Sequence, residues 1–226
     1  MLQLPTLLDL KRSKEIQIGS LLLFGFLLTS LLIWFRALSF FDFVTTITFQ
    51  SITPRFLDTP FSFFSLFGTF EITALLLVLV IVKSKTSWFN TFVILAGFLA
   101  ILGIETTLKQ FLHHPSPPPA FNRYDLPVFF PTSEVQFPFA YPSGHLGRTT
   151  YLLVTIWFLL ALNLKPASKK RTLLISLFIL GFIMAYSRVY LGEHWISDVV
   201  GGSLLGAGIG YLVWGLLKTG KFKLTP

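Results

Sequence analysis

The segment from Ser187 to Asp198 places a serine, an arginine, a histidine and an aspartate within twelve residues, between two long apolar runs. Charged side chains in such a setting are costly and commonly functional. His194 and Asp198 are four residues apart, so they share a face if this segment is helical. The aspartate would then fix the proton on one imidazole nitrogen and leave the other free as a base or nucleophile. On its own, such a pair is often structural.

Two neighbours of this pair favour a bound anion. Arg188 is a permanent cation at the predicted end of one helix. Gly192 predicts a turn, so the amide groups and dipole at the start of the following helix would attract negative charge.

Two further short polar segments interrupt the apolar sequence. Together with the segment from Ser187 to Asp198, we call them the three polar islands. In Pro142-Ser-Gly-His145, Ser143 would cap a helix and Gly144 would let the backbone approach a ligand closely. Taken alone, this is an ordinary helix start. The other island extends from Lys109 to Pro117, and Lys109 alone would be a lysine that snorkels to the membrane surface.

Together the three islands predict a site for phosphoryl transfer. Their cations and helix-start amides suit phosphate, and their histidines suit a nucleophile and a general acid. The sequence has no acidic cluster that would hold a metal, so we expect neither a metal nor another cofactor. His113 and His114 are possible ligands, but adjacent histidines at a membrane surface are commonly incidental.

The composition indicates a membrane protein. Of the 226 residues, 53% are hydrophobic and 12% are charged, whereas an average soluble domain is about 25% charged. The net charge of +8 forms no basic stripe, so we expect no nucleic-acid partner. The chain has no cysteine, which excludes disulfides and thiolate metal sites.

Six apolar runs predict six transmembrane helices. They cover residues 18–35, 61–82, 87–112, 144–164, 172–191 and 195–217. A sheet is disfavoured, because open sheet edges cannot face lipid. The first run could be a signal peptide, but no small-residue cleavage site follows it, so we interpret it as a retained span. Residues 36–60 are aromatic and contain Pro54 and Pro60, which is typical of an interfacial segment.

Basic residues alternate between the two sides of this topology. Twelve of the eighteen fall on the side of both termini: Lys11, Arg12, Lys14, Lys83, Lys85, Lys165, Lys169, Lys170, Arg171, Lys218, Lys221 and Lys223. The positive-inside rule then places the termini in the cytoplasm and the three polar islands on the outer face.

The longest connection, residues 113–141, contains seven prolines. Loops of this length are usually functional or disordered. Its aromatic residues predict that the loop lies either on the membrane surface or over a lipid-binding cleft, and both alternatives stay open. These aromatic residues are Phe121, Tyr124, Phe129, Phe130, Phe137 and Phe139.

These islands resemble the signature of the type 2 phosphatidic acid phosphatase superfamily of integral membrane lipid phosphatases. That signature reads K-x6-R-P, then P-S-G-H, then S-R-x5-H-x3-D. The second motif is intact at residues 142–145 and the third at residues 187–198. With the six-helix topology, the resemblance extends over most of the chain.

The first motif departs from the family at one position. Lys109 and Pro117 match, but Ser116 stands where the family has a phosphate-binding arginine. Arg148 is our candidate for the replacement, because it lies three residues after His145 and so on the same helical face. His114 and Arg123 are the alternatives.

The resemblance implies a metal-independent mechanism. His194, oriented by Asp198, would attack phosphorus and form a phosphohistidine, while His145 would protonate the leaving oxygen and then activate water. Lys109, Arg188, Ser143 and the Gly144 amide would hold the phosphoryl oxygens. Glu105, one helical turn before Lys109, would position that lysine. Glu71, near the middle of the second predicted span, matches no motif.

We therefore expect one membrane-embedded domain over residues 1–226, an all-α integral membrane bundle of six helices like that family's. It would hydrolyse a terminal phosphate from a lipid phosphate or diphosphate of the undecaprenyl diphosphate, phosphatidylglycerol phosphate or phosphatidic acid class. We expect a bacterial plasma membrane with the active site on its outer face, and the oligomeric state stays open. The alternatives are a phosphotransferase that uses another lipid or a sugar as acceptor, and a non-catalytic lipid-binding relative.

Overall fold

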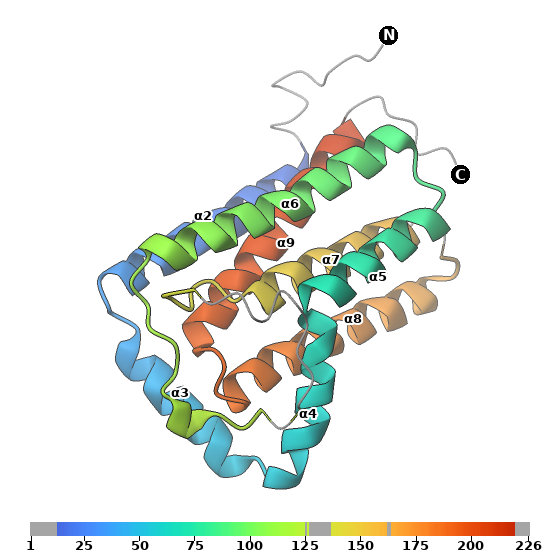
Figure 1. Ribbon diagram of the computed structural model, residues 1–226. Coiled ribbons are helices and arrows are strands. Elements are labelled where there is room, and N and C mark those ends of the chain that lie inside the picture. Colours follow the sequence, from blue (N-terminus) through green and yellow to red (C-terminus); the bar gives the residue numbers. More distant parts are fainter. Residues whose placement is uncertain (1–12, 125, 127–136, 162–163, 220–226) are drawn as a thin grey trace.

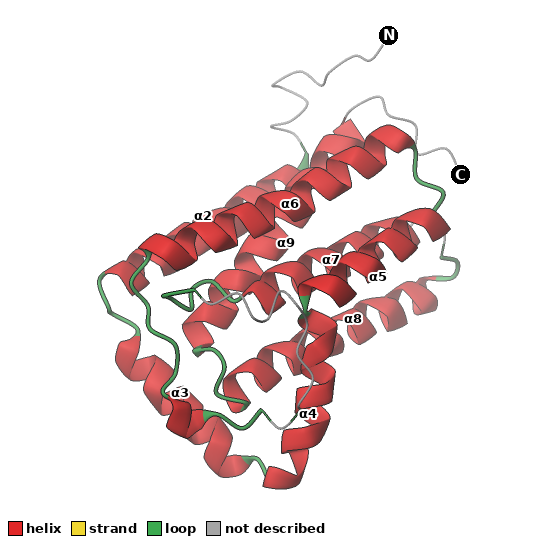
Figure 2. Ribbon diagram, viewed as in Figure 1, coloured by secondary structure: helices red, strands yellow, loops and turns green. Residues whose placement is uncertain are grey.

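The computed structural model describes residues 13–124, 126, 137–161 and 164–219, and these residues form helices and loops without a strand (Figure 2). The α-helices are α2 (Lys14–Trp34), α3 (Ser39–Ile52), α4 (Asp58–Ser65), α5 (Phe70–Lys83), α6 (Trp88–Phe111), α7 (Gly144–Ala161), α8 (Ala167–Tyr190) and α9 (Ile196–Thr219). Three 3-10 turns are η1 (Arg55–Leu57), η2 (Leu66–Gly68) and η3 (Pro119–Phe121). The predicted all-α class is confirmed for this part of the chain.

The number of membrane spans is smaller than predicted when length and apolarity are both required. Among the described residues, four helices meet both conditions: α2, α6, α8 and α9. The bent pair Arg55–Gly68 and Phe70–Lys83, with 57° between its parts, would make a fifth. Helix α7 falls short because its first turns carry His145 and Arg148. A count of six is therefore not confirmed.

Small residues hold α7 against α9 in the middle of the bundle (Figure 1). A Cβ atom on Gly206 of α9 would overlap the carbonyl oxygen of Gly147 in α7, so these two backbones touch directly. Large buried side chains fill the space around this contact, including Ile101 of α6, Tyr151 of α7 and Leu205 of α9. This packing fixes the start of α7 beside the start of α9, where two of the three polar islands lie.

The segment before α5 differs from the prediction. Residues 39–68, expected to be an interfacial segment followed by the start of a span, form α3, η1, α4 and η2 in succession. Helix α5 begins only at Phe70, so Glu71 lies in its first turn. In the bent pair Arg55–Gly68 and Phe70–Lys83, Glu71 therefore lies close to the bend near the middle. Phe40 and Phe56 are 80% and 75% exposed, which suits the expected contact with a membrane surface.

Figure 1 shows that the helix ends fall into two groups. The start of α2, the end of α5, the starts of α6 and α8 and the end of α9 lie at one end of the bundle. The end of α6, the starts of α7 and α9, the end of α8, and helices α3 and α4 lie at the other. All three polar islands therefore meet at one end, opposite the basic connections that include Lys83, Lys85 and Lys169.

Candidate active site

The turn between α8 and α9 places His194 beside Asp198. Gly192 adopts a left-handed φ of 69°, and its N–H donates to the Val189 carbonyl at 3.1 Å. The Glu193 N–H donates to the Arg188 carbonyl at 3.2 Å, which completes a Schellman end to α8. His194 thus precedes α9, so the two residues do not share a helical face as predicted, but the pair still forms across the start of the helix.

Asp198 is fully buried and accepts hydrogen bonds from three groups. Its Oδ2 lies 3.3 Å from Nδ1 of His194 and 3.0 Å from the Trp195 backbone nitrogen, and its Oδ1 lies 2.7 Å from Nδ1 of His114. Because Asp198 takes Nδ1 of His194, Nε2 is the nitrogen left for chemistry. Burial lowers the pKa of His194, and the bond to Asp198 offsets this only in part. The imidazole is therefore held neutral, as a nucleophile requires.

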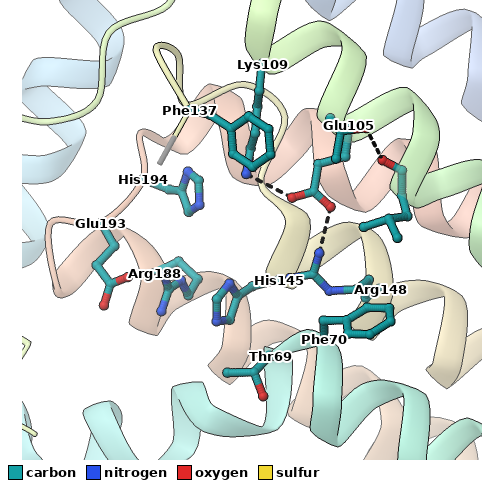
Figure 3. A pocket seen from close by; sticks show the side chains of 12 residues that line it. Thr69, Phe70, Glu105, Lys109, Phe137, His145, Arg148, Arg188, Glu193 and His194 are labelled. Atoms are coloured by element: carbon teal, nitrogen blue, oxygen red, sulfur yellow. Dashed lines mark hydrogen bonds and ion pairs between the residues drawn. The ribbon is translucent and has the colours of Figure 1, made fainter. Parts of the chain in front are cut away.

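A cavity of about 370 Å³ brings five of the predicted site residues together (Figure 3). Lys109 comes from α6, His145 and Arg148 from α7, Arg188 from α8, and His194 from the turn before α9. Figure 3 shows Arg188, His145 and Arg148 side by side, with His194 and Lys109 above them in this view. The cavity thus combines two imidazoles with three cations.

Glu105 of α6 joins two of these cations. Its Oε1 lies 2.8 Å from Nζ of Lys109, which confirms the predicted pair, and its Oε2 lies 2.7 Å from Nη1 of Arg148. A Cβ atom on Gly144 would overlap the Glu105 carboxylate. The prediction that Gly144 leaves room for a ligand was therefore wrong in this respect: the space beside it is occupied by Glu105.

Both arginines keep donor capacity inside the protein. Arg188 donates to Oγ of Ser65 at 3.0 Å and pairs with Glu193, and Arg148 reaches the Gly68 carbonyl at 3.4 Å. The Nε of each arginine is buried without a hydrogen-bond partner among the described residues. Buried donors of this kind need an explanation, and an anion in the cavity would supply one.

Ser143 does not cap α7 with its side chain as predicted. Its carbonyl accepts from the Gly147 N–H at 3.0 Å, but its hydroxyl is buried without a partner among the described residues. Its own N–H donates to the Asp198 carbonyl at 3.0 Å. Ser143 therefore ties the start of α7 to the start of α9 through the main chain, and neither it nor Gly144 lines the cavity.

A second cavity of about 480 Å³ adjoins the first, and His145 and Arg188 line both. Ser116, at the family's arginine position, lies in the wall of this second cavity, whereas Arg148 lies in the wall of the first. Tyr124 also lines the second cavity.

The two alternatives to Arg148 as the substitute cation lie elsewhere. Arg123 stacks over the ring of Tyr190, with 5.0 Å between its guanidinium carbon and the ring centre. His114 is buried behind Asp198. Neither side chain lines the first or the second cavity, so Arg148 remains the candidate.

Parts of the long loop cover the site. Phe137 lines the first cavity, and Nζ of Lys109 lies 5.4 Å from the centre of its ring. Phe121 packs against Phe43 and Trp195. The loop aromatics were expected either on the membrane surface or over a cleft, and Phe137 and Tyr124 line the first and the second cavity. Phe129 and Phe130 lie outside the described residues.

Two residues behind the site, His114 and Asp42, have roles that no local sequence pattern predicts. The sequence indicates His114 either as an incidental histidine or as an alternative cation for phosphate, and Asp42 lies in the segment expected to be interfacial. In the structure His114 contacts both Asp42 and Asp198. In the sequence, His114 is a histidine close to the Lys109 motif and Asp42 is an acid among phenylalanines. Neither pattern is specific to a role in the site.

Comparison with known proteins defines the class. The model of the PAP2 superfamily matches residues 85–221, and the chain belongs to this superfamily, as its motifs predicted. The fold agrees: the crystal structure of a transmembrane PAP2 type phosphatidylglycerolphosphate phosphatase from Bacillus subtilis aligns with a TM-score of 0.73 at 23% identity. That alignment covers 88% of this chain and 96% of the other.

Two curated relatives are more similar over shorter segments. The chain is 36% identical over 78 residues to phosphatidylglycerophosphatase B of Bacillus subtilis, covering 34% of this chain and 38% of that protein. It is 35% identical over 90 residues to an undecaprenyl-diphosphatase of Sulfolobus acidocaldarius, covering 38% and 37%. The matches thus span less than two fifths of these relatives.

Proposed function

We propose that this protein is a membrane-bound, metal-independent lipid phosphatase that removes a terminal phosphate from a lipid phosphate or diphosphate. The observation that carries the proposal is the cavity in which His194, His145 and the cations Lys109, Arg148 and Arg188 meet. The names of the two relatives support a phosphatidylglycerol phosphate or a polyprenyl diphosphate as the substrate class. Leu102 and Phe137 give the cavity an apolar side that suits the lipid next to the phosphate.

The first half-reaction uses both histidines. Nε2 of His194 attacks phosphorus, the bond between phosphorus and the leaving lipid oxygen breaks, and His145 gives that oxygen a proton. The three cations hold the remaining phosphoryl oxygens, where negative charge develops. Asp198 stabilises the imidazolium form of His194 that arises when its nitrogen becomes phosphorylated.

The second half-reaction releases the phosphate. His145, now neutral, takes a proton from a water molecule, whose oxygen attacks phosphorus while the bond to Nε2 of His194 breaks. Inorganic phosphate leaves and His145 is again protonated, ready for the next substrate. The cycle as written uses side chains of the protein and a water molecule, and no metal.

The test is phosphate release by the purified protein from a panel of lipid phosphates and diphosphates, with and without EDTA. We expect release that withstands EDTA and is abolished by His194→Ala. His113→Ala is the matched control, because His113 is exposed and packs against Phe139 outside the cavity. Release that survives His194→Ala, or that EDTA removes and a divalent ion restores, would contradict the proposal.

The same protein also tests the nature of the intermediate. We expect acid-labile phosphate on the chain during turnover, at His194. Transfer of that phosphate to a second lipid or a sugar in place of water would identify a phosphotransferase. No labelled chain and no release from any lipid would identify a non-catalytic relative.

A further inference from the structure

His114 lies between two buried carboxylates. Its Nδ1 is 2.7 Å from Oδ1 of Asp198, and its Nε2 is 3.3 Å from Oδ2 of Asp42. The three side chains come from different elements: α3 supplies Asp42, the loop after α6 supplies His114, and α9 supplies Asp198. Their residues are 1%, 7% and 0% exposed. The imidazole thus bridges two acids inside the protein.

Asp42 is anchored on its other side by the start of α9. It accepts hydrogen bonds from the backbone N–H of Ser197 at 2.9 Å and from the Ser197 hydroxyl at 2.8 Å. These donors hold the Asp42 carboxylate against the positive end of α9. Asp42 therefore has a fixed position from which to hold His114.

The surroundings favour a protonated His114. Burial lowers the pKa of His114, but its hydrogen bonds to Asp198 and Asp42 outweigh burial and raise this pKa to about 9. Among the described residues, the other titratable groups that face the cluster are Tyr141, whose ring centre lies 6.5 Å from that of His114, and His194 on the far side of Asp198. An imidazolium has two N–H groups and can donate to both acids, whereas a neutral ring can donate to only one of them.

We propose that His114 is a positioning residue of the active site: held by Asp42, it occupies Oδ1 of Asp198 and so directs Oδ2 to Nδ1 of His194. The nucleophile then keeps its proton on Nδ1 and its bare Nε2 for phosphorus. This inference rests on the proposed function. It extends the His194–Asp198 pair to a hydrogen-bonded chain of four side chains that also includes His114 and Asp42. His114 acts through Asp198 and touches no substrate, because it lines neither cavity.

The variant that tests this proposal is His114→Asn, which keeps a hydrogen-bond donor but removes the cation. We expect kcat for phosphate release to fall about 10- to 100-fold, the size of effect seen at metal sites when a ligating histidine loses its hydrogen-bonded partner. KM should not change. The acid limb of the pH–rate profile should move to higher pH, because Asp198 and His194 both take up a proton more readily when the neighbouring cation is gone.

His113→Asn is the matched control, since it is the same substitution at the adjacent, exposed histidine. It should leave kcat and the profile unchanged. Asp42→Asn should resemble His114→Asn, and the double variant should lose no more than the worse single one, because the two residues act as one unit.

A measurement independent of activity is NMR of the protein with labelled histidines, of which the chain has four. His114 should stay protonated to about pH 9. Its signal is identified by elimination, as the one that remains when His113, His145 and His194 are substituted one at a time. A signal that titrates near pH 6.5 would contradict the proposal. This measurement on the intact protein decides the point even where His114→Asn does not fold.

The activity data separate this inference from the proposed function. A wild-type protein that releases no phosphate would overturn the proposed function and this inference with it. An active wild type whose His114→Asn variant keeps kcat and the acid limb, even with a lower unfolding temperature, would overturn only the inference. In that case His114 would be a structural link between α3 and α9.

Discussion

At the scale of single residues, the proposed phosphate site depends most on Arg148, because Ser116 supplies no charge at the motif's arginine position. Charge-assisted hydrogen bonds are worth about 1.5–3 kcal/mol. Arg148→Ala should therefore lower kcat/KM for phosphate release about 10- to 150-fold, whereas Ser116→Ala should leave it nearly unchanged. Equal and small effects of the two substitutions would contradict the assignment of Arg148 as the cation that replaces the arginine of the motif.

A rescue variant sharpens this comparison. Position 116 lies in the wall of the second cavity, which shares His145 and Arg188 with the first. Adding Ser116→Arg to Arg148→Ala should therefore restore part of the lost activity by returning a guanidinium to the phosphate. Unfolding temperatures of both variants show whether the loss comes from the site or from the fold.

His194 sets a second prediction at this scale. Its pKa is lowered by burial, with the charges of Arg188 and Lys109 acting in the same direction. A base with a lowered pKa stays neutral to more acidic pH, so the acid limb of kcat/KM should lie below the ordinary histidine value of about 6.5. A pH profile of phosphate release from pH 4 to 8 (about the range that a histidine covers) measures this. An acid limb above 6.5 would contradict a buried neutral nucleophile.

At the scale of elements, Glu105 links α6 to α7 through Arg148 and also holds Lys109. Removing one partner of a buried ion pair leaves a buried charge uncompensated and costs about 3 kcal/mol or more. Glu105→Gln should lower the free energy of unfolding by this amount, measured by chemical denaturation in detergent. Glu15→Gln is the matched control: Glu15 pairs with Lys218, whose side chain is 59% exposed, and such pairs are worth less than about 1 kcal/mol. Equal costs would refute the structural role of Glu105.

The elements also show what could be predicted from the sequence. Apolar runs broken by charged islands predicted where α6 and α8 end and where α7 and α9 begin, so Lys109, His145, Arg188 and His194 could be placed at one end of the bundle. The helical path of residues 39–68 could not be predicted, because its phenylalanines indicate only contact with a membrane surface. Asp42 and Asp198 are 156 residues apart, and no local pattern records that a histidine lies between them.

The same limit applies to Gly144 and Glu105. The P-S-G-H motif predicted a glycine that makes room for something, but only the packing of α6 against α7 shows that a carboxylate of the protein fills that room. Which residues of the motifs lie at the site could be predicted from the helix ends and the motifs. Their mutual contacts depend on which helices are neighbours, and hydrophobic pattern alone does not determine this.

At the scale of the whole molecule, the basic residues at the two ends of the bundle predict how the protein is oriented in the membrane. The end with the active site also holds Arg55, at the start of η1 and shortly before Ser65, which contacts Arg188. The opposite end holds Lys169, near the start of α8. By the positive-inside rule, we expect the end rich in lysine to face the cytoplasm and the active site to face outward. The side of the membrane on which phosphate is released follows from this orientation.

The absence of cysteine makes this orientation directly testable, because any thiol label reports only the residue introduced. Arg55 and Lys169 are both exposed, so single variants Arg55→Cys and Lys169→Cys should fold and should keep phosphate release. In intact cells a membrane-impermeant maleimide should label Arg55→Cys, and it should label Lys169→Cys only after the membrane is permeabilised. The reverse pattern would place the active site on the cytoplasmic face, and the phosphate would then have to come from lipids of the inner leaflet.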